Sequence, residues 1–180
     1  MRQIELKTYP DPCLRVKTRA LGEVDNDLED LLTRMTDLMY ESGGIGLAAP
    51  QVGVGIRVFV MDTGSGSSVF VDPEIIESSP SKTTLEEGCL SLPGITVKVS
   101  RPEKISVRAR DSKGEMFTKI YDGLEAKAVQ HEMEHLEGRL IIDHLDPLRR
   151  FFVTRRLSGK YKDQESGRCE VVCCVRKDDK

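Results

Sequence analysis

The stretch 130–135 reads QHEMEH and lies in an apolar-periodic run, residues 124–137, that predicts a helix. On a helix, His131 and His135 are separated by one turn plus about 40°, so both imidazoles can bind one ion. Glu132 lies about 100° round the helix from His131, which places its carboxylate beside that ion. The pattern therefore predicts a metal-dependent hydrolase with Glu132 as its general acid/base.

Two histidines leave the site incomplete, because a catalytic tetrahedral ion usually takes three protein ligands and one water. The third-histidine position of the extended HExxHxxGxxH pattern holds Ile141, and His144 follows Asp143 in a predicted strand end, where a structural or surface role is expected. Cys89, in the segment EGCLS, is the better candidate. A thiolate with two imidazoles suits zinc, iron(II), cobalt or nickel. Taken alone, Cys89 is slightly better interpreted as a buried core thiol.

Patterns on both sides of the predicted helix indicate an α+β fold with mostly antiparallel sheets packed around it. Residues 28–39 have the spacing of an N-terminal amphipathic helix, and the basic run 148–162 that of a C-terminal one. Between them, alternating apolar residues from 56 to 109 predict strands, and a further strand is expected near residue 140. We expect one catalytic domain, residues 1–162, followed by a polar tail, residues 163–180.

Composition excludes several other classes of protein. The chain has 180 residues, of which 38% are hydrophobic, a formal net charge of -3 and a pI near 5.7. This charge disfavours direct, sequence-specific binding of nucleic acid, and no apolar run is long enough for a signal peptide or a membrane span. The sequence therefore predicts a cytoplasmic protein with no membrane association, in which the five cysteines are buried, catalytic or metal-bound.

Three segments, taken together and in this order, resemble the peptide deformylase family: residues 44–51 (GIGLAAPQ), 87–91 (EGCLS) and 130–135 (QHEMEH). The similarity continues through residues 92–94 and through Arg101. Members of that family remove the formyl group from the N-terminal formylmethionine of nascent polypeptides, giving formate and a free amine. The resemblance implies the same activity here.

The resemblance also implies a role for each matching residue. It implies metal ligation by Cys89, His131 and His135, catalysis by Glu132, and stabilisation of an oxyanion by the Gln51 amide and the Leu90 backbone N–H. One divalent ion is expected, Fe²⁺ physiologically, with Zn²⁺, Ni²⁺ or Co²⁺ as alternatives. Residues expected to bind or surround the substrate are Ile45, Gly46, Glu87, Leu124 and Ala128, with Glu87 supporting the metal site.

Some alternatives stay open on the sequence. A peptidase could use the same HExxH chemistry on internal peptide bonds, and a fourth protein ligand would make the metal site structural. The family more often has aspartate where this chain has Glu134, and the extra methylene could shift a hydrogen bond near the site. The basic segment 148–162 is either a solvated helix or, as in bacterial members of the family, a contact with the ribosome.

Overall fold

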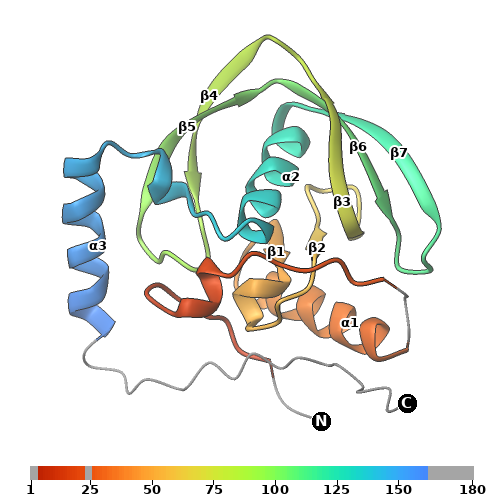
Figure 1. The fold of residues 1–180 in the computed structure, drawn as a ribbon, viewed down its shortest axis with the longest axis horizontal. Coiled ribbons are helices and arrows are strands. Elements are labelled where there is room, and N and C mark those ends of the chain that lie inside the picture. The colour runs from red at the N-terminus through yellow and green to blue at the C-terminus, as the bar shows by residue number, and fades with distance from the viewer. Residues whose placement is uncertain (1–3, 23–25, 162–180) are drawn as a thin grey trace, which may run out of the picture.

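Helix α2, Gly123–Leu136, lies at the centre of the computed structural model, which describes residues 4–22 and 26–161 (Figure 1). Sheets surround it, α1 lies beneath it, and α3 stands apart at one side. The other helices are η1 (Pro12–Arg15), α1 (Asn26–Glu41), η2 (Ala49–Val52), η3 (Ile141–His144) and α3 (Pro147–Tyr161). The strands are β1 (Gly46–Ala48), β2 (Val58–Met61), β3 (Ser68–Ser78), β4 (Lys82–Gly88), β5 (Thr96–Pro102), β6 (Lys104–Arg110) and β7 (Met116–Asp122).

Every strand pairing within the two sheets is antiparallel. One sheet has five strands in the order β1-β2-β3-β6-β7, and the other is the β4-β5 pair. Only three residues separate β3 from β4, and only Glu103 separates β5 from β6. The chain therefore passes from one sheet into the other twice, from β3 to β4 and from β5 to β6, and both segments arch over α2 (Figure 1). This architecture confirms the predicted α+β fold with antiparallel sheets around the HExxH helix.

The sheet is buried on both faces where it supports the site. All four residues of β2 are buried, since Phe59 and Met61 pack in the cluster that contains α2 side chains, whereas Val58 and Val60 pack in the cluster of α1. In contrast, β5 alternates exposed and buried residues, because one of its faces is solvated. Strand β1 contacts both α1 and α2 and is held between them.

Two strands and one 3₁₀ helix differ from the sequence prediction. The strands β4 and β7 are mostly exposed on both faces, so their sequences carry little alternation to reveal them. The segment near residue 140, predicted as a strand, forms η3, and that prediction was wrong. Its consecutive residues Ile141 and Ile142 are both buried, and the Asp143 carboxylate accepts a hydrogen bond from the Leu140 N–H at 2.9 Å.

The predicted C-terminal helix is confirmed as α3. The Asp146 carboxylate accepts a hydrogen bond from the Arg149 N–H at 3.0 Å and so caps its first turn. Leu157 is buried and, with Val153, packs in the cluster that contains η3. The predicted tail, residues 163–180, lies outside the described residues, and the single-domain assignment for residues 1–162 stays a prediction.

The C-terminal end of α2 is closed by the N-terminal segment of the chain. The backbone N–H and the side-chain hydroxyl of Thr18 both donate to the Leu136 carbonyl, at 2.9 Å each. Gly138 has a φ of +69°, and a Cβ there would lie 2.6 Å from the Arg15 carbonyl oxygen. Only glycine fits this turn, which confirms the predicted helix end. Among the described residues, no helix is long and apolar enough to cross a membrane.

Candidate active site

Three side chains able to bind a metal ion meet between β4 and α2. Cys89 follows the last residue of β4, while His131 and His135 lie on successive turns of α2. The Cys89 Sγ lies 3.2 Å from the His135 Nε2, and one ligand atom from each of the three residues lies within 4.8 Å of the others. The predicted ligand set is therefore assembled from segments far apart in the sequence.

The chemistry of these donors fits a divalent transition-metal ion. One thiol and two imidazoles, with no fourth ligand in the cluster among the residues that the structure describes, match a catalytic site that keeps a coordination position open. With the protein groups alone, burial opposes a charge on His131, but hydrogen bonds to Cys89 and Glu87 outweigh it and raise the pKa of His131 to about 10. The surroundings of His131 thus favour a positive charge at the place where an ion would bind.

Glu87 fixes the orientation of the His131 ring. The His131 Nδ1 lies 3.0 Å from the Glu87 Oε2, and because an ionised carboxylate only accepts, the Nδ1–H donates. The Nε2 is then the nitrogen available to an ion, which would replace the proton on it. Arg101 donates to both oxygens of Glu87, at 2.7 and 2.9 Å. Although burial alone would raise the pKa of Glu87, the bonds from His131 and Arg101 lower it to about 2. Glu87 is therefore a fixed anion behind the ligand.

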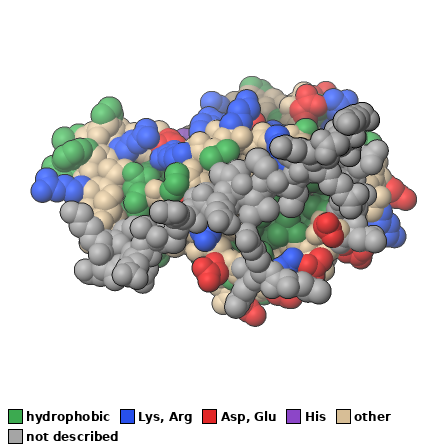
Figure 2. Space-filling model, turned by 60° about the horizontal axis from the view of Figure 1, so that its bottom comes forward, with side chains coloured by type: hydrophobic (Ala, Val, Ile, Leu, Met, Phe, Trp, Pro, Cys, Tyr) green, Lys and Arg blue, Asp and Glu red, His purple; other side chains and the backbone are tan. Residues whose placement is uncertain are grey.

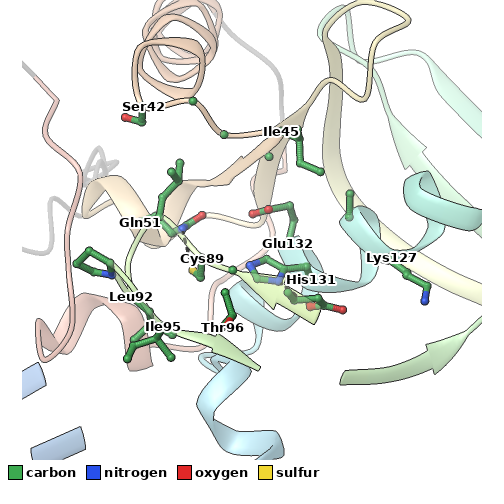
Figure 3. A pocket seen from close by; sticks show the side chains of 18 of the residues that line it. Ser42, Ile45, Gln51, Cys89, Leu92, Ile95, Thr96, Lys127, His131 and Glu132 are labelled. Atoms are coloured by element: carbon green, nitrogen blue, oxygen red, sulfur yellow. Dashed lines mark hydrogen bonds and ion pairs between the residues drawn. The ribbon is translucent and has the colours of Figure 1, made fainter. Parts of the chain in front are cut away.

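Glu132 is buried, with 4% of its surface exposed, and its Oε2 has no hydrogen-bond partner within the described part of the chain. Burial raises the pKa of Glu132 to about 7, against the opposing charges of His131 and Arg101. Figure 3 shows its carboxylate pointing into the cleft between Gln51 and His131. A carboxyl group with this pKa, placed beside the ligand set, is suited to accept and return a proton near neutral pH.

The Gln51 amide is held in one orientation at the edge of η2. Its Oε1 accepts from the Ala48 N–H at 2.8 Å, and its Nε2 donates to the Ser91 hydroxyl at 3.1 Å and lies 3.7 Å from the Cys89 Sγ. The nearby Leu90 N–H makes no hydrogen bond within residues 4–22 and 26–161. Gln51 and Leu90 both line the cleft together with Cys89, and each offers a hydrogen-bond donor of the kind that an oxyanion site requires.

A cleft of about 680 Å³ opens in front of these groups (Figure 3). It brings together all the predicted site residues except His135, which is buried and contacts Cys89. Ile45 and Leu124 line its mouth with 44% and 53% of their surfaces exposed, and Ala128 lies deeper. Sequence reasoning missed Leu85, also exposed at this mouth, because β4 gives no alternation signal.

Sequence reasoning assigned no contacts to Ser91 and Arg101. Both are buried polar residues, and each is held by long-range hydrogen bonds. The buried position of Arg101 in the alternating pattern of β5 was a usable signal, since a charged residue there needs an ionised partner. Ser91 carried no such signal.

An open ion site with a desolvated carboxylate beside it and an apolar cleft in front of it is the arrangement with which metal-dependent hydrolases cleave amide bonds, and we assign the chain to that class. The family model for polypeptide deformylases matches residues 3–151, and the chain belongs to this family. Its members are metal-dependent hydrolases that remove N-formyl groups from nascent peptides.

Individual relatives agree with this assignment. The peptide deformylase of Thermotoga petrophila is 41% identical over 84% of this chain and 93% of the relative. Peptide deformylase 1 of Clostridium perfringens is 46% identical over 77% of this chain and 95% of the relative. The crystal structure of peptide deformylase from Thermotoga maritima superposes with a TM-score of 0.79 at 39% identity, over 82% of this chain and 100% of that one.

Gly46 gives a direct test of the position of Glu132. A Cβ at residue 46 would lie 2.3 Å from the Glu132 Oε1, and its three nearest atoms all belong to the Glu132 side chain. We expect Gly46→Ala to displace this carboxylate while the rest of the fold stays intact. Since a shift of about 1 Å can cost on the order of a hundredfold in rate, kcat/KM for hydrolysis should fall by about that factor.

Gly55→Ala is the matched control for this substitution, because a Cβ at residue 55 meets no atom within 4 Å. It should keep full activity, and circular dichroism should show both variants folded at the assay temperature. Wild-type kcat/KM in Gly46→Ala would show that the carboxylate does not need this position.

Proposed function

We propose that this chain hydrolyses the formyl amide of N-formylmethionyl nascent peptides, with an ion held by Cys89, His131 and His135 and with Glu132 as the group that moves the proton. The observation that carries the assignment of roles is the buried Glu132 carboxylate, which has a pKa of about 7 and faces the cleft beside the ligand set. Glu132 accepts a proton from water as the water oxygen attacks the formyl carbon. It then gives the proton to the amide nitrogen as the C–N bond breaks, which releases formate and a free amine.

A divalent ion bound here would supply Lewis acidity towards water and towards the formyl oxygen. The protein contributes donors for the negative charge that develops on that oxygen. The Gln51 amide is pinned by Ala48 and Ser91, and the Leu90 N–H is free of protein acceptors among the described residues. Such donors need no reorganisation during the reaction, which is why they stabilise the transition state more than water does.

The apolar mouth of the cleft fits the methionine side chain. Ile45, Leu85 and Leu124 expose large hydrophobic surfaces there, and Ala128 leaves space behind them. Burying an unbranched thioether among these side chains removes apolar surface from water at about 25 cal/mol per Å². We place the substrate's first residue in this slot, and the reaction in the cytoplasm, where nascent chains are made.

Glu132→Gln tests the assigned chemistry. The amide keeps the shape of the side chain but cannot accept the proton, so kcat for formyl-Met-Ala-Ser should fall by roughly 10²- to 10⁴-fold while bound metal per chain stays near wild type. Formate and free amine should be quantified together, with acetyl-Met-Ala-Ser as the unreactive control. Hydrolysis that survives in Glu132→Gln would remove the base assignment, and a metal-loaded wild type that yields no formate would indicate a structural metal site.

We propose Fe²⁺ as the physiological ion, following the family resemblance, although the usual affinity order places Zn²⁺ above Fe²⁺ at equal availability. A thiolate with two imidazoles accepts either ion. Protein purified without oxygen should contain iron and should lose activity in air as the iron–thiolate centre oxidises. Zinc as the dominant ion in such a sample, with full activity, would overturn this proposal.

We also propose that α3 contacts the ribosome. Its exposed surface combines hydrophobic and basic side chains, which Figure 2 shows gathered at the end of the molecule where Figure 1 places α3. Leu148, Phe151 and Phe152 are 55–67% exposed. Arginines at 149, 150, 155 and 156 are exposed on the same helix. Ribosomal RNA is a polyanion that such a surface can bind.

Sedimentation with ribosomes at low salt tests this contact. The double variant Arg155→Glu/Arg156→Glu should bind about tenfold more weakly, with a shallower dependence on salt, because two cationic contacts become repulsive. Lys104→Glu/Lys113→Glu is the matched control, since it makes the same charge change at two exposed residues outside α3, in β6 and in the turn that follows it. Equal binding of the two double variants would exclude α3 as the contact.

A further inference from the structure

A chain of ionic contacts leads from the metal ligand His131 to the protein surface at His144. His131 donates to Glu87, Arg101 donates to Glu87, and the same Arg101 Nη2 donates to the Glu134 Oε2 at 2.9 Å. The His144 Nε2 lies 2.9 Å from the Glu134 Oε1 and 3.0 Å from the Glu134 Oε2. The groups come from α2, β4, β5 and η3.

The position of Arg101, and so its contact with Glu87, depends on the second carboxylate that Arg101 contacts, Glu134. Its guanidinium is 4% exposed, and its Nη2 is shared between the two carboxylates, so its position depends on both. Glu134 is 9% exposed at its side chain, accepts a hydrogen bond from Arg101, and lies 2.9 Å from the His144 Nε2. A buried carboxylate of this kind loses its orientation when one of its donors is removed.

We propose that His144 is a positioning residue for the metal centre: it fixes Glu134, and through Arg101 and Glu87 it fixes the imidazole plane of His131. His144 is 31% exposed at its side chain and contacts neither the cleft nor the ligand atoms, so its effect passes entirely through these contacts. The inference rests on the proposed assignment of His131 as a metal ligand.

The length of the Glu134 side chain matters for this coupling. One Glu134 carboxylate has to reach Arg101 on β5 and His144 on η3 at hydrogen-bond distance simultaneously. Aspartate would withdraw the carboxylate by roughly 1.5 Å, the length of one C–C bond, and contacts near 2.9 Å do not survive such a shift on both sides. The contact between Glu134 and His144 therefore depends on the methylene group by which glutamate is longer than aspartate.

The test measures release of Zn²⁺ from the folded holoenzyme to a chromophoric chelator, a readout that needs no catalysis. Removing a direct hydrogen-bond partner of a metal ligand typically costs 10- to 100-fold in affinity, and for this more distant residue we expect His144→Ala to speed release by about 3- to 10-fold. His144→Gln keeps an N–H donor at a similar distance and should stay within about twofold of wild type.

Arg139→Ala is the matched control, because Arg139 also faces the Glu134 Oε1, but at 3.9 Å and with 60% of its side chain exposed. Its release rate should equal that of wild type. Glu134→Asp should release Zn²⁺ at least as fast as His144→Ala. Adding His144→Ala to Glu134→Asp should not speed release further, since the contact with His144 is already lost. Glu134→Asp also tests the coupling independently of any effect of His144→Ala on folding.

Wild-type release from both His144→Ala and Glu134→Asp, with circular dichroism showing both variants folded, would overturn the proposal. Additive effects in the double variant would overturn the coupling through Glu134. Either result leaves the assignment of deformylase chemistry standing if formate is still produced. Conversely, a chain that produced no formate would still report on His144 through its release rates.

Discussion

The site depends most on the ion pairs that the buried guanidinium of Arg101 forms with Glu87 and Glu134. Arg101 joins β5 to Glu87 near the end of β4, the strand that precedes Cys89, and to Glu134 on α2, the helix that carries His131 and His135. Removing one partner from a buried ion pair commonly costs about 3–5 kcal/mol, because the remaining charge is left unpaired. Arg101 therefore ties β4 to α2 through these two carboxylates, and one of them, Glu87, contacts the His131 ring.

The second constraint is the close approach of β1 to α2. Gly46 has no side chain, and the Glu132 carboxylate occupies the space that a Cβ would take. The β1 backbone can come this near because β1 is paired to β2 and held between α1 and α2. The same approach contributes to the burial of Glu132, and that burial raises the pKa of its carboxyl group.

The sequence predicts much of this centre, and the reasons are local. His131, Glu132 and His135 follow from helical spacing alone, and the three matched segments then brought Cys89, Gln51 and Leu90 to the same site. The contacts behind them could not be read in the same way. The pairing of Arg101 with Glu134, and of Glu134 with His144, depends on where β5 and η3 pack on α2. The segment of η3 even suggested a strand, because its buried isoleucines carry no helical spacing.

The electrostatics of the site link metal binding to the ionisation of Glu132. Raising its pKa from 4.5 to about 7 means that, with the protein groups alone, ionising this buried carboxyl group costs the folded state roughly 3 kcal/mol at alkaline pH. The cost is absent below the unfolded pKa, grows as the pH rises from the unfolded pKa to the folded one, and stays constant at higher pH. A divalent cation held by Cys89, His131 and His135 would favour the ionised form of Glu132 and so offset part of this cost. The fold therefore tolerates a poorly solvated acid because the ligand set beside it is built to hold positive charge.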